Sequence, residues 1–306
     1  MTVSQGPPPP TTPRPRRPWG AAILSILVPG LGHVYGGAPR RALFAFVAYY
    51  TAGTLFVLAT AAWPSIIVLA SGLGFMALLI VIIAWDSART ARGAGSLYAL
   101  KVYNRWFVYT SALLLSTLVV SPTHFRFLSS ILRAYQMPSV SMEPTLLRGD
   151  YVLARPLRQP PSRGDLVIYR DRAGTYIKRI IGLPTDTVSM RGAILFVNGH
   201  SVLEPYTAST QGPDVSDTAF SWQRRYLTSG ADPLAYQPTR DNWGPILVPD
   251  DAYFILGDNR GNSYDSRHAG FVSVDSVVQE PVLVYFSRAP EAGVRWYRIG
   301  VRFATK

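Results

Sequence analysis

Four apolar stretches dominate the first part of the chain, at about residues 21–35, 42–63, 65–85 and 106–122. A helix that crosses a bilayer needs roughly 20 apolar residues. The second and third stretches meet this length, and the fourth, at the short limit, has Trp106 and Tyr109 as interfacial anchors. The first is short and is interrupted by PGLGHVYGG. The pattern predicts a disordered Pro/Arg-rich cytosolic tail at 1–18 and an α-helical membrane module of three to four apolar segments at 19–122.

Basic residues indicate how these segments are oriented. Arginines flank the first stretch on both sides, at positions 14, 16, 17, 40 and 41. The loop at 86–105 holds four more basic residues. Because Lys and Arg are enriched in cytoplasmic loops, these flanks are expected inside. The first stretch would then be a re-entrant or interfacial hairpin bent at Pro29, Gly30 and Gly32, and the chain after Pro122 would lie outside. If the first stretch instead spans, this parity reverses unless another stretch fails to cross.

From about residue 147 the pattern changes to short runs rich in Val, Ile and Tyr, separated by Gly, Pro and Asp. Such runs predict strands and turns. They are DYVLARP, GDLVIYRD, TYIKRIIGL, DTVSM, AILFVNGH, AYFILGD and VVQEPVLVYFS. Asn198-Gly199 is a signal for a tight hairpin, and residues 206–245 are expected to form a polar excursion outside the main sheet. The sequence therefore predicts a mostly-β extracytoplasmic domain at 123–306.

Composition narrows the classes of function. The net charge is +12, but nine of the basic residues and only one acid lie in residues 1–105, among the apolar segments. This distribution fits membrane topology better than a nucleic-acid surface, so no nucleic-acid partner is expected. The absence of cysteine excludes disulfides, zinc–thiolate sites and cysteine catalysis. The four histidines are scattered and show no HExxH spacing, so we expect no metal and no cofactor.

The segment MPSVSMEPTL at 137–146 holds two serines, Ser139 and Ser141, with no Gly-x-Ser-x-Gly elbow and no histidine within ten residues. A candidate base lies in TYIKRIIGLP, where strand alternation places Lys178 on one face with Tyr176 and Ile180. Burial lowers the pKa of a lysine, and a neutral lysine can take a proton from a serine. The alternative, which strand alternation alone favours, is a lysine on an edge strand with its ammonium in water.

A third segment, FILGDNRGNSYDSRHAGFV at 254–272, is dense in Asp, Asn, Ser and Arg after an apolar strand. Two other interpretations compete here. One is a turn network in which Asp and Asn bond their own backbone. The other is a calcium loop with oxygen ligands from Asp258, Asn262 and Asp265, although the spacing does not match an EF-hand. The functional hypothesis is a supporting layer that holds a lysine and a serine in register.

Together, PSVSMEPTL, YIKRIIGLP and GDNRGNSYDSR occur in this order on the predicted β domain. The set resembles bacterial type I signal peptidase, a membrane-bound serine endopeptidase that removes signal peptides from exported proteins. The resemblance covers roughly residues 135–287. Its lesser matches are RGDYVLARP, RGDLVIY, VNGHSVLEPY and NWGPILVPDDAYFILGD. It implies a Ser/Lys dyad that works without histidine.

The resemblance implies roles for seven residues. Ser141 would be the nucleophile, Lys178 the general base, Ser139 an oxyanion-hole hydroxyl, Ser263 the serine that orients the lysine, Asp265 and Arg267 a supporting ion pair, and Met142 a residue lining the site. The chain departs from the family at Gly261, where Asp is usual. Its N-terminal half is also unusual: through PGLGHVYGG and AWDSARTAR it resembles small multi-span bacterial modules of unknown role.

The resemblance implies a multi-pass protein of the bacterial cytoplasmic membrane whose catalytic domain lies outside. Its partners would be the lipid bilayer and signal-peptide-bearing preproteins that emerge from the export machinery. Three alternatives stay open. They are a specialised peptidase that matures one pilin-like or conjugative substrate, a self-cleaving Ser/Lys regulator, and a non-catalytic membrane scaffold. Membrane segments and the lack of a helix-turn-helix count against the regulator.

Overall fold

The computed structural model describes residues 16–95, 98–208, 213–228, 232–289 and 291–303. Most of the expected tail at 1–18 therefore lies outside the described residues. The chain forms two compact units, one mainly helical that reaches Ser129 and one mainly β that starts at Ser130. The predicted fold class, apolar helices followed by a mostly-β domain, is confirmed. We describe each unit by itself.

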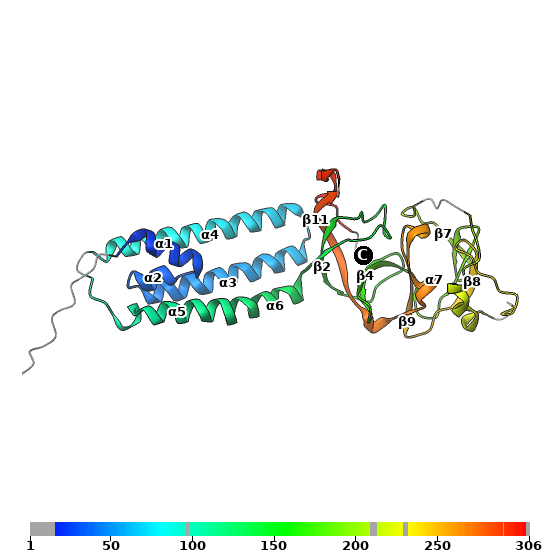
Figure 1. Ribbon diagram of the computed structural model, residues 1–306, viewed down its shortest axis with the longest axis horizontal. Helices are drawn as coiled ribbons and strands as arrows, with labels where there is room; N and C mark the ends of the chain where they lie inside the picture. Colours follow the sequence, from blue (N-terminus) through cyan, green and yellow to red (C-terminus); the bar gives the residue numbers. More distant parts are fainter. Residues whose placement is uncertain (1–15, 96–97, 209–212, 229–231, 290, 304–306) are drawn as a thin grey trace, which may run out of the picture. The chain divides into compact units, whose positions relative to one another are not determined.

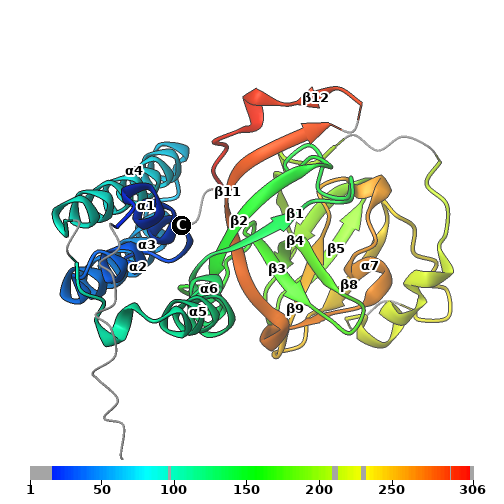
Figure 2. The same ribbon diagram turned by 60° about the vertical axis from the view of Figure 1, so that its left-hand side comes forward.

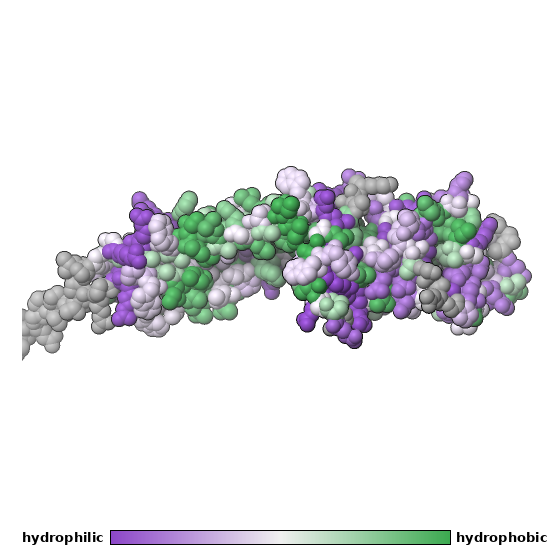
Figure 3. All heavy atoms as spheres, turned by 90° about the horizontal axis from the view of Figure 1, so that it is seen from above, coloured by the Kyte–Doolittle hydropathy of each residue, from purple (hydrophilic) through white to green (hydrophobic). Residues whose placement is uncertain are grey.

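The helical unit contains three helices that are long and apolar enough to cross a membrane. They are α3 (Pro39–Ala62), α4 (Ile66–Gly93) and the continuous helix Trp106–Ile131, with 24, 28 and 26 residues. They run alongside one another (Figure 1). Apolar residues cover much of the visible face of this unit, and hydrophilic residues gather at its left-hand end (Figure 3). Leu43, Phe44 and Ile67, for example, are each more than 60% exposed. A belt of this extent is unusual on a water-exposed surface and typical of helices that face lipid.

The third long helix continues nine residues past Pro122, where the sequence predicted the fourth apolar segment to end. It consists of α5 (Trp106–Leu115), a π turn, η2 (Ser116–Val120), and α6 (Ser121–Ile131). Proline lacks an N–H and clashes with the carbonyl four residues earlier in a regular helix. The wider π turn, in which the Ser121 N–H donates to the Ser116 carbonyl, lies directly before Pro122. We attribute the passage of the helix through proline to this turn.

The first apolar stretch forms a short hairpin of α1 (Pro18–Leu27) and α2 (Leu31–Tyr35). The predicted bend is present, and it includes Gly30 at φ 90°. A 10-residue helix is about 15 Å long, half the hydrocarbon thickness. His33 lies 2.9 Å from Asp86, and Ser87 donates to the Ala21 carbonyl at 3.1 Å. The two motifs of unknown role, PGLGHVYGG and AWDSARTAR, therefore pack against each other.

The β unit is built from two antiparallel sheets. The larger has the order β1-β2-β11-β3-β4-β9-β10, with β12 added to β11, and its strands curl around the domain (Figure 2). Its strands are β1 (Arg133–Gln136), β2 (Asp150–Pro156), β3 (Leu166–Arg170), β4 (Thr175–Gly182), β9 (Ala252–Leu256), β10 (Val272–Ser273), β11 (Val277–Ala289) and β12 (Gly293–Val294). The smaller sheet, β7-β6-β5-β8, comprises β5 (Thr187–Arg191), β6 (Ile194–Val197), β7 (His200–Val202) and β8 (Trp243–Leu247).

Two local predictions in this unit can be compared with the structure. Asn198 and Gly199 join β6 to β7 with φ of 52° and 80°, which confirms the tight hairpin. The expected polar excursion at 206–245 contains the 3-10 helix η3 (Thr218–Tyr226), and its last residues belong to β8. Residues 209–212 and 229–231 of the excursion lie outside the described residues. The sequence did not separate β8 from the excursion because Gly244 and Pro245 interrupt its strand pattern.

Candidate active site

Strand β4 places Lys178 in the interior of the larger sheet. The strand pairs with β3 on one side and β9 on the other, so it is not an edge strand. Ile177 packs into one core cluster and Ile180 into another. The Lys178 side chain is buried, with the residue only 3% exposed. The alternative of a lysine that reaches water along a sheet edge is therefore excluded.

The two serines of MPSVSMEPTL lie in the loop between β1 and β2. Met142 and Leu146 in this loop are fully buried and anchor it in a core cluster. The Asn259 backbone N–H donates to the Ser141 carbonyl at 3.1 Å, and its amide donates to the Val140 carbonyl at 3.2 Å. The loop that carries Ser141 is therefore held from below by apolar packing and from the side by the segment after β9.

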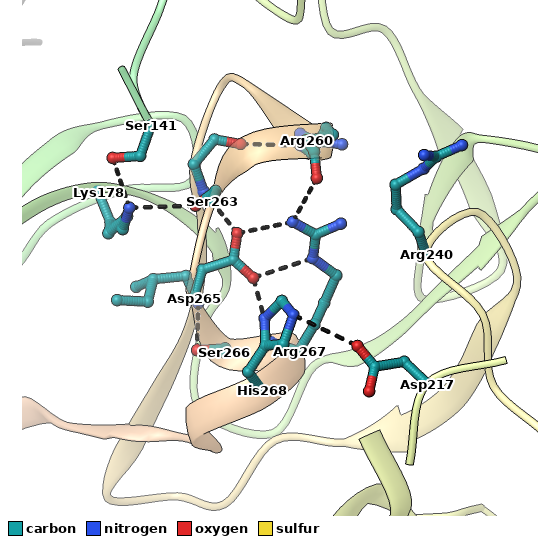
Figure 4. A network of polar contacts seen from close by, with 12 residues as sticks. Ser141, Lys178, Asp217, Arg240, Arg260, Ser263, Asp265, Ser266, Arg267 and His268 are labelled. Carbon is teal, nitrogen blue, oxygen red and sulfur yellow. Dashed lines mark hydrogen bonds and ion pairs between the residues drawn. The ribbon is translucent and has the colours of Figure 1, made fainter. Parts of the chain in front are cut away.

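The loop and the strand bring Ser141 and Lys178 into direct contact. Lys178 Nζ lies 2.8 Å from Ser141 Oγ and 3.1 Å from Ser263 Oγ (Figure 4). Ser139 Oγ lies 3.1 Å from Ser141 Oγ. Four of the seven residues singled out in the sequence thus form a chain of hydrogen-bond contacts, from Ser139 through Ser141 and Lys178 to Ser263. A hydroxyl beside an amine is the geometry of a nucleophile and its base.

An ion pair lies behind Ser263. Asp265 and Arg267 are almost fully buried, and Arg267 Nε donates to Asp265 Oδ1 at 2.9 Å (Figure 4). Asp265 also bonds Ser263 and accepts from the Gly257 N–H at 3.0 Å. Burial alone would raise the pKa of Asp265, but Arg267 and these donors lower it below its ordinary value. The carboxylate is therefore ionised and orients the hydroxyl that contacts the lysine.

Burial controls the charge of Lys178. Desolvation lowers its pKa from 10.5 to about 8, assisted by Arg267 and opposed by Asp265 and Asp258. Within the part of the chain that the structure describes, no carboxylate reaches the ammonium at ion-pair distance. A buried ammonium with only hydroxyl neighbours loses its proton more easily than a paired one. The amine is thus close to the range in which it can act as a base.

Other functional residues were not identified from the sequence. A Cβ on Gly257 would lie 2.2 Å from Ser263 Oγ and 2.5 Å from the Ser141 carbonyl, so only glycine fits here. Arg179 Nε donates to Asp258 Oδ1 at 2.8 Å, and Thr145 in the nucleophile loop donates to Asp258 Oδ2 at 2.5 Å. Because Asp258 is paired with arginine, it is not available as a calcium ligand. A glycine directly after an apolar strand was the available signal for Gly257.

A cleft of about 320 Å³ opens in front of the dyad. Its lining includes residues 135–139, 175–178, Ser141, Asn262 and Tyr264. Met142, for which the resemblance implied a lining role, is absent from the described lining because its side chain is fully buried in the core. Gly261 is exposed and makes none of the side-chain contacts to Lys178 or Asp265 described above. The departure at this position leaves the dyad geometry intact.

Known proteins similar to this chain match the region that carries the site. The model of the family described as "Signal peptidase, peptidase S26" matches residues 106–286. Signal peptidase I of Bacillus amyloliquefaciens is 35% identical over 156 residues, covering 50% of this chain and 75% of that protein. A probable signal peptidase I-2 of Synechocystis is 33% identical over 175 residues, covering 54% and 67%. The crystal structure of a signal peptidase I from Enterococcus faecalis is 30% identical, with a TM-score of 0.26, covering 39% of this chain and 94% of that one.

Proposed function

The chain belongs to the signal peptidase family, peptidase S26, and is a serine endopeptidase; we propose that Ser141 and Lys178 form its catalytic dyad. The observation that carries this proposal is the 2.8 Å contact between a serine hydroxyl and a buried lysine whose pKa is about 8. At pH 7 about a tenth of such a lysine is neutral, against less than one part in a thousand at the ordinary pKa. The substrate bond is the one that joins a signal peptide to an exported protein.

In the first step, neutral Lys178 takes the hydroxyl proton of Ser141 as Oγ attacks the scissile carbonyl carbon. The carbonyl oxygen becomes an oxyanion, which accepts hydrogen bonds from the Ser139 hydroxyl and the Ser141 backbone N–H. The position of Ser139 Oγ, 3.1 Å from the attacking atom, supports this role. One such donor is worth about 3 kcal/mol in a comparable site.

In the second step, the lysine ammonium returns its proton to the nitrogen of the leaving amine and the C–N bond breaks. An ester between Ser141 and the signal peptide remains. Water then attacks this ester, losing a proton to the same lysine, and the Ser141 oxygen recovers a proton as it leaves. Ser263 keeps Lys178 Nζ in place throughout, since it is hydrogen-bonded to both the lysine and the ionised Asp265.

We further propose a multi-pass protein of the bacterial cytoplasmic membrane with its catalytic unit outside. This is supported by three helices of spanning length, by basic residues in the first turn of α3 and at and beyond the C-terminal end of α4, and by the family's association with membranes. An odd number of crossings puts the β unit on the side opposite to the basic N-terminal flank. The substrate would be a preprotein whose apolar segment lies in the same bilayer.

The test uses the full chain in liposomes with a preprotein that carries a cleavable signal peptide. Ser141→Ala and Lys178→Ala should each lower the cleavage rate by at least about a thousandfold. Lys178→Arg should fail equally, because guanidinium does not release its proton near neutral pH. Cleavage at the unmodified rate in Ser141→Ala and Lys178→Ala would falsify the dyad.

A matched control is Ser201→Ala on β7, which replaces an exposed serine in the smaller sheet and should leave cleavage unchanged. A serine-reactive phosphonate probe distinguishes an enzyme from a scaffold. Labelling of the unmodified chain and of Ser201→Ala, but not of Ser141→Ala, is expected. Equal labelling of all three proteins contradicts a role for Ser141 as the nucleophile.

A further inference from the structure

An exposed tyrosine stands at the rim of the active-site cleft. Tyr264 lines the cleft together with Ser139 and Lys178, yet it is 70% exposed. By contrast, Met137 and Ile177, which line the same cleft, are 4% and 7% exposed and form its floor. We infer that Tyr264 determines specificity by contacting the substrate side chain two residues before the scissile bond, at position −2. This inference rests on the proposed function.

The alternation of side chains along an extended substrate places the side chain at −2 near Tyr264. When the scissile carbonyl is at Ser141 Oγ, the preceding residues lie in the cleft between residues 135–138 and 175–178, which line it. In an extended chain, side chains alternate between two faces. If the side chains at −1 and −3 point to the floor at Met137 and Ile177, the side chain at −2 points away from it. The rim is then its protein neighbour, and Tyr264 supplies an aromatic surface there.

Tyr264 is held by a stack of rings, although it is exposed. Its ring lies parallel to His268, with centroids 5.1 Å apart and an interplanar angle of 22°. His268 in turn packs edge-on against Phe220 at 4.7 Å and lies 3.7 Å from Asp217. Phe220 is 2% exposed. Because His268 is fixed on two sides, the tyrosine ring has a preferred orientation before substrate arrives, which lowers the entropy cost of contact.

The polar excursion supplies this support. The helix η3 of the excursion is fastened to α7 (Ser266–Ala269), because the Trp222 indole N–H donates to the Arg267 carbonyl at 2.8 Å. Gln223 donates to the same carbonyl at 3.4 Å. Arg267 also pairs with Asp265, which bonds the Ser263 hydroxyl that contacts Lys178. One short segment therefore carries the contact with the excursion, the rim tyrosine and the ion pair behind the dyad. The excursion thereby acquires a function in substrate selection as well as in packing.

The chemistry of a tyrosine ring sets the preference. Its face favours an apolar or aromatic side chain, and a cation, over a small or anionic one. We expect peptides with Leu or Phe at −2 to be cleaved about five- to tenfold faster, in kcat/KM, than peptides with Gly or Asp there. This preference is separate from the preference for small residues at −1 and −3.

The experiment measures kcat/KM of the full chain in detergent micelles on one series of peptides that differ only at −2 and a matched series that differ only at +1. In Tyr264→Ala the ratio of the leucine peptide to the glycine peptide should fall to about 1, whereas Tyr264→Phe should keep most of it. His268→Ala should lower the ratio partly, and His268→Phe, which keeps a flat ring, should restore it. Tyr297→Ala, a tyrosine with similar exposure outside the cleft lining, should leave the ratio unchanged.

Three outcomes decide the matter. A ratio that Tyr264→Ala does not change overturns the inference, and so does a change confined to peptides that vary at +1. In both cases the unmodified chain still cleaves its peptides, so the dyad stands. If the unmodified chain cleaves none of them, the proposed function fails, and the inference fails with it.

Discussion

Lys178 and Arg179 are neighbours on β4 and both are buried, but their side chains lie on opposite faces of the strand and meet different partners. Arg179 forms a bidentate ion pair with Asp258, donates to the Gly164 carbonyl and stacks on Tyr206 at 3.8 Å. Lys178 contacts two hydroxyls. The guanidinium on one face is therefore held by a direct carboxylate, whereas the ammonium on the other face loses its proton more easily than usual.

The difference lies in where the carboxylate is placed. Asp258 contacts its arginine directly, whereas Asp265 is separated from the lysine by the Ser263 hydroxyl and neutralised by Arg267. A direct carboxylate would favour the charged form of the lysine and raise its pKa. With a hydroxyl between them, the lysine is oriented without being held in the charged form. In this site the general base is therefore oriented by a carboxylate that contacts it only through a hydroxyl.

Removing the carboxylate from the Arg179–Asp258 ion pair should have the largest effect on stability. Asp258→Asn keeps the shape of the side chain but leaves the Arg179 charge buried without a carboxylate. We expect a loss of about 3 kcal/mol, because removing one partner of a buried pair strands the other. Hydrogen exchange of the β4 and β9 amides in the full chain measures this loss.

The control is the double variant Arg179→Met with Asp258→Leu, which removes both charges and should recover most of the protection. If the single variant exchanges at the unmodified rate, the pair contributes little and the contrast between the two faces fails.

On the other face, removing the charge should stabilise the fold. In the folded protein the pKa of Lys178 is lowered to about 8, so burial of the ammonium opposes folding fully below pH 8 and less as pH rises towards 10.5. Lys178→Met should raise the free energy of unfolding by up to about 3 kcal/mol at pH 7, and by little above pH 10.5. Hydrogen exchange at both pH values measures this gain. Lys178→Arg, which stays charged, should show no such gain, and a less stable Lys178→Met would contradict the argument.

The smallest effect concerns orientation. With a base of pKa about 8, kcat/KM should rise with pH up to about 8 and then level off, because the neutral amine is the active form. Ser263→Ala should lower the plateau roughly tenfold without moving the inflection. Ser263 positions the amine, and the negative charge of Asp265 is already compensated by Arg267. Ser263→Thr, which keeps the hydroxyl, is the control. An inflection displaced by a full pH unit in Ser263→Ala would show that the serine sets the charge instead.

Much of this arrangement was predictable from local patterns. Apolar length predicted the helices, and alternation in TYIKRIIGLP predicted that Lys178 shares a face with apolar neighbours. Alternation could not decide between an edge strand and an interior strand. That depends on β9, about 75 residues later, which pairs with the strand. The burial of Lys178 is therefore a property of the sheet order and not of the segment.

The rest depended on contacts that no local pattern encodes. The fourth apolar segment was expected to end near Pro122, where the apolar run stops, whereas the helix continues to Ile131 through a π turn that no pattern in the sequence indicated. The family resemblance implied that Met142 lines the site, but the loop turns its side chain into the core. The partners of Arg179 required the return of the chain at Asp258.

Gly257 shows that an active site can depend on empty space. It contributes no group to the reaction, yet its missing side chain is what allows the main chain at Ser141 and the hydroxyl of Ser263 to approach the same point. The placement of the nucleophile is consequently a backbone property, fixed by how closely two loops can approach. A protein could therefore have every reactive group of this site in its sequence and still be inactive. Any residue larger than glycine at this one position would prevent the two loops from approaching closely enough.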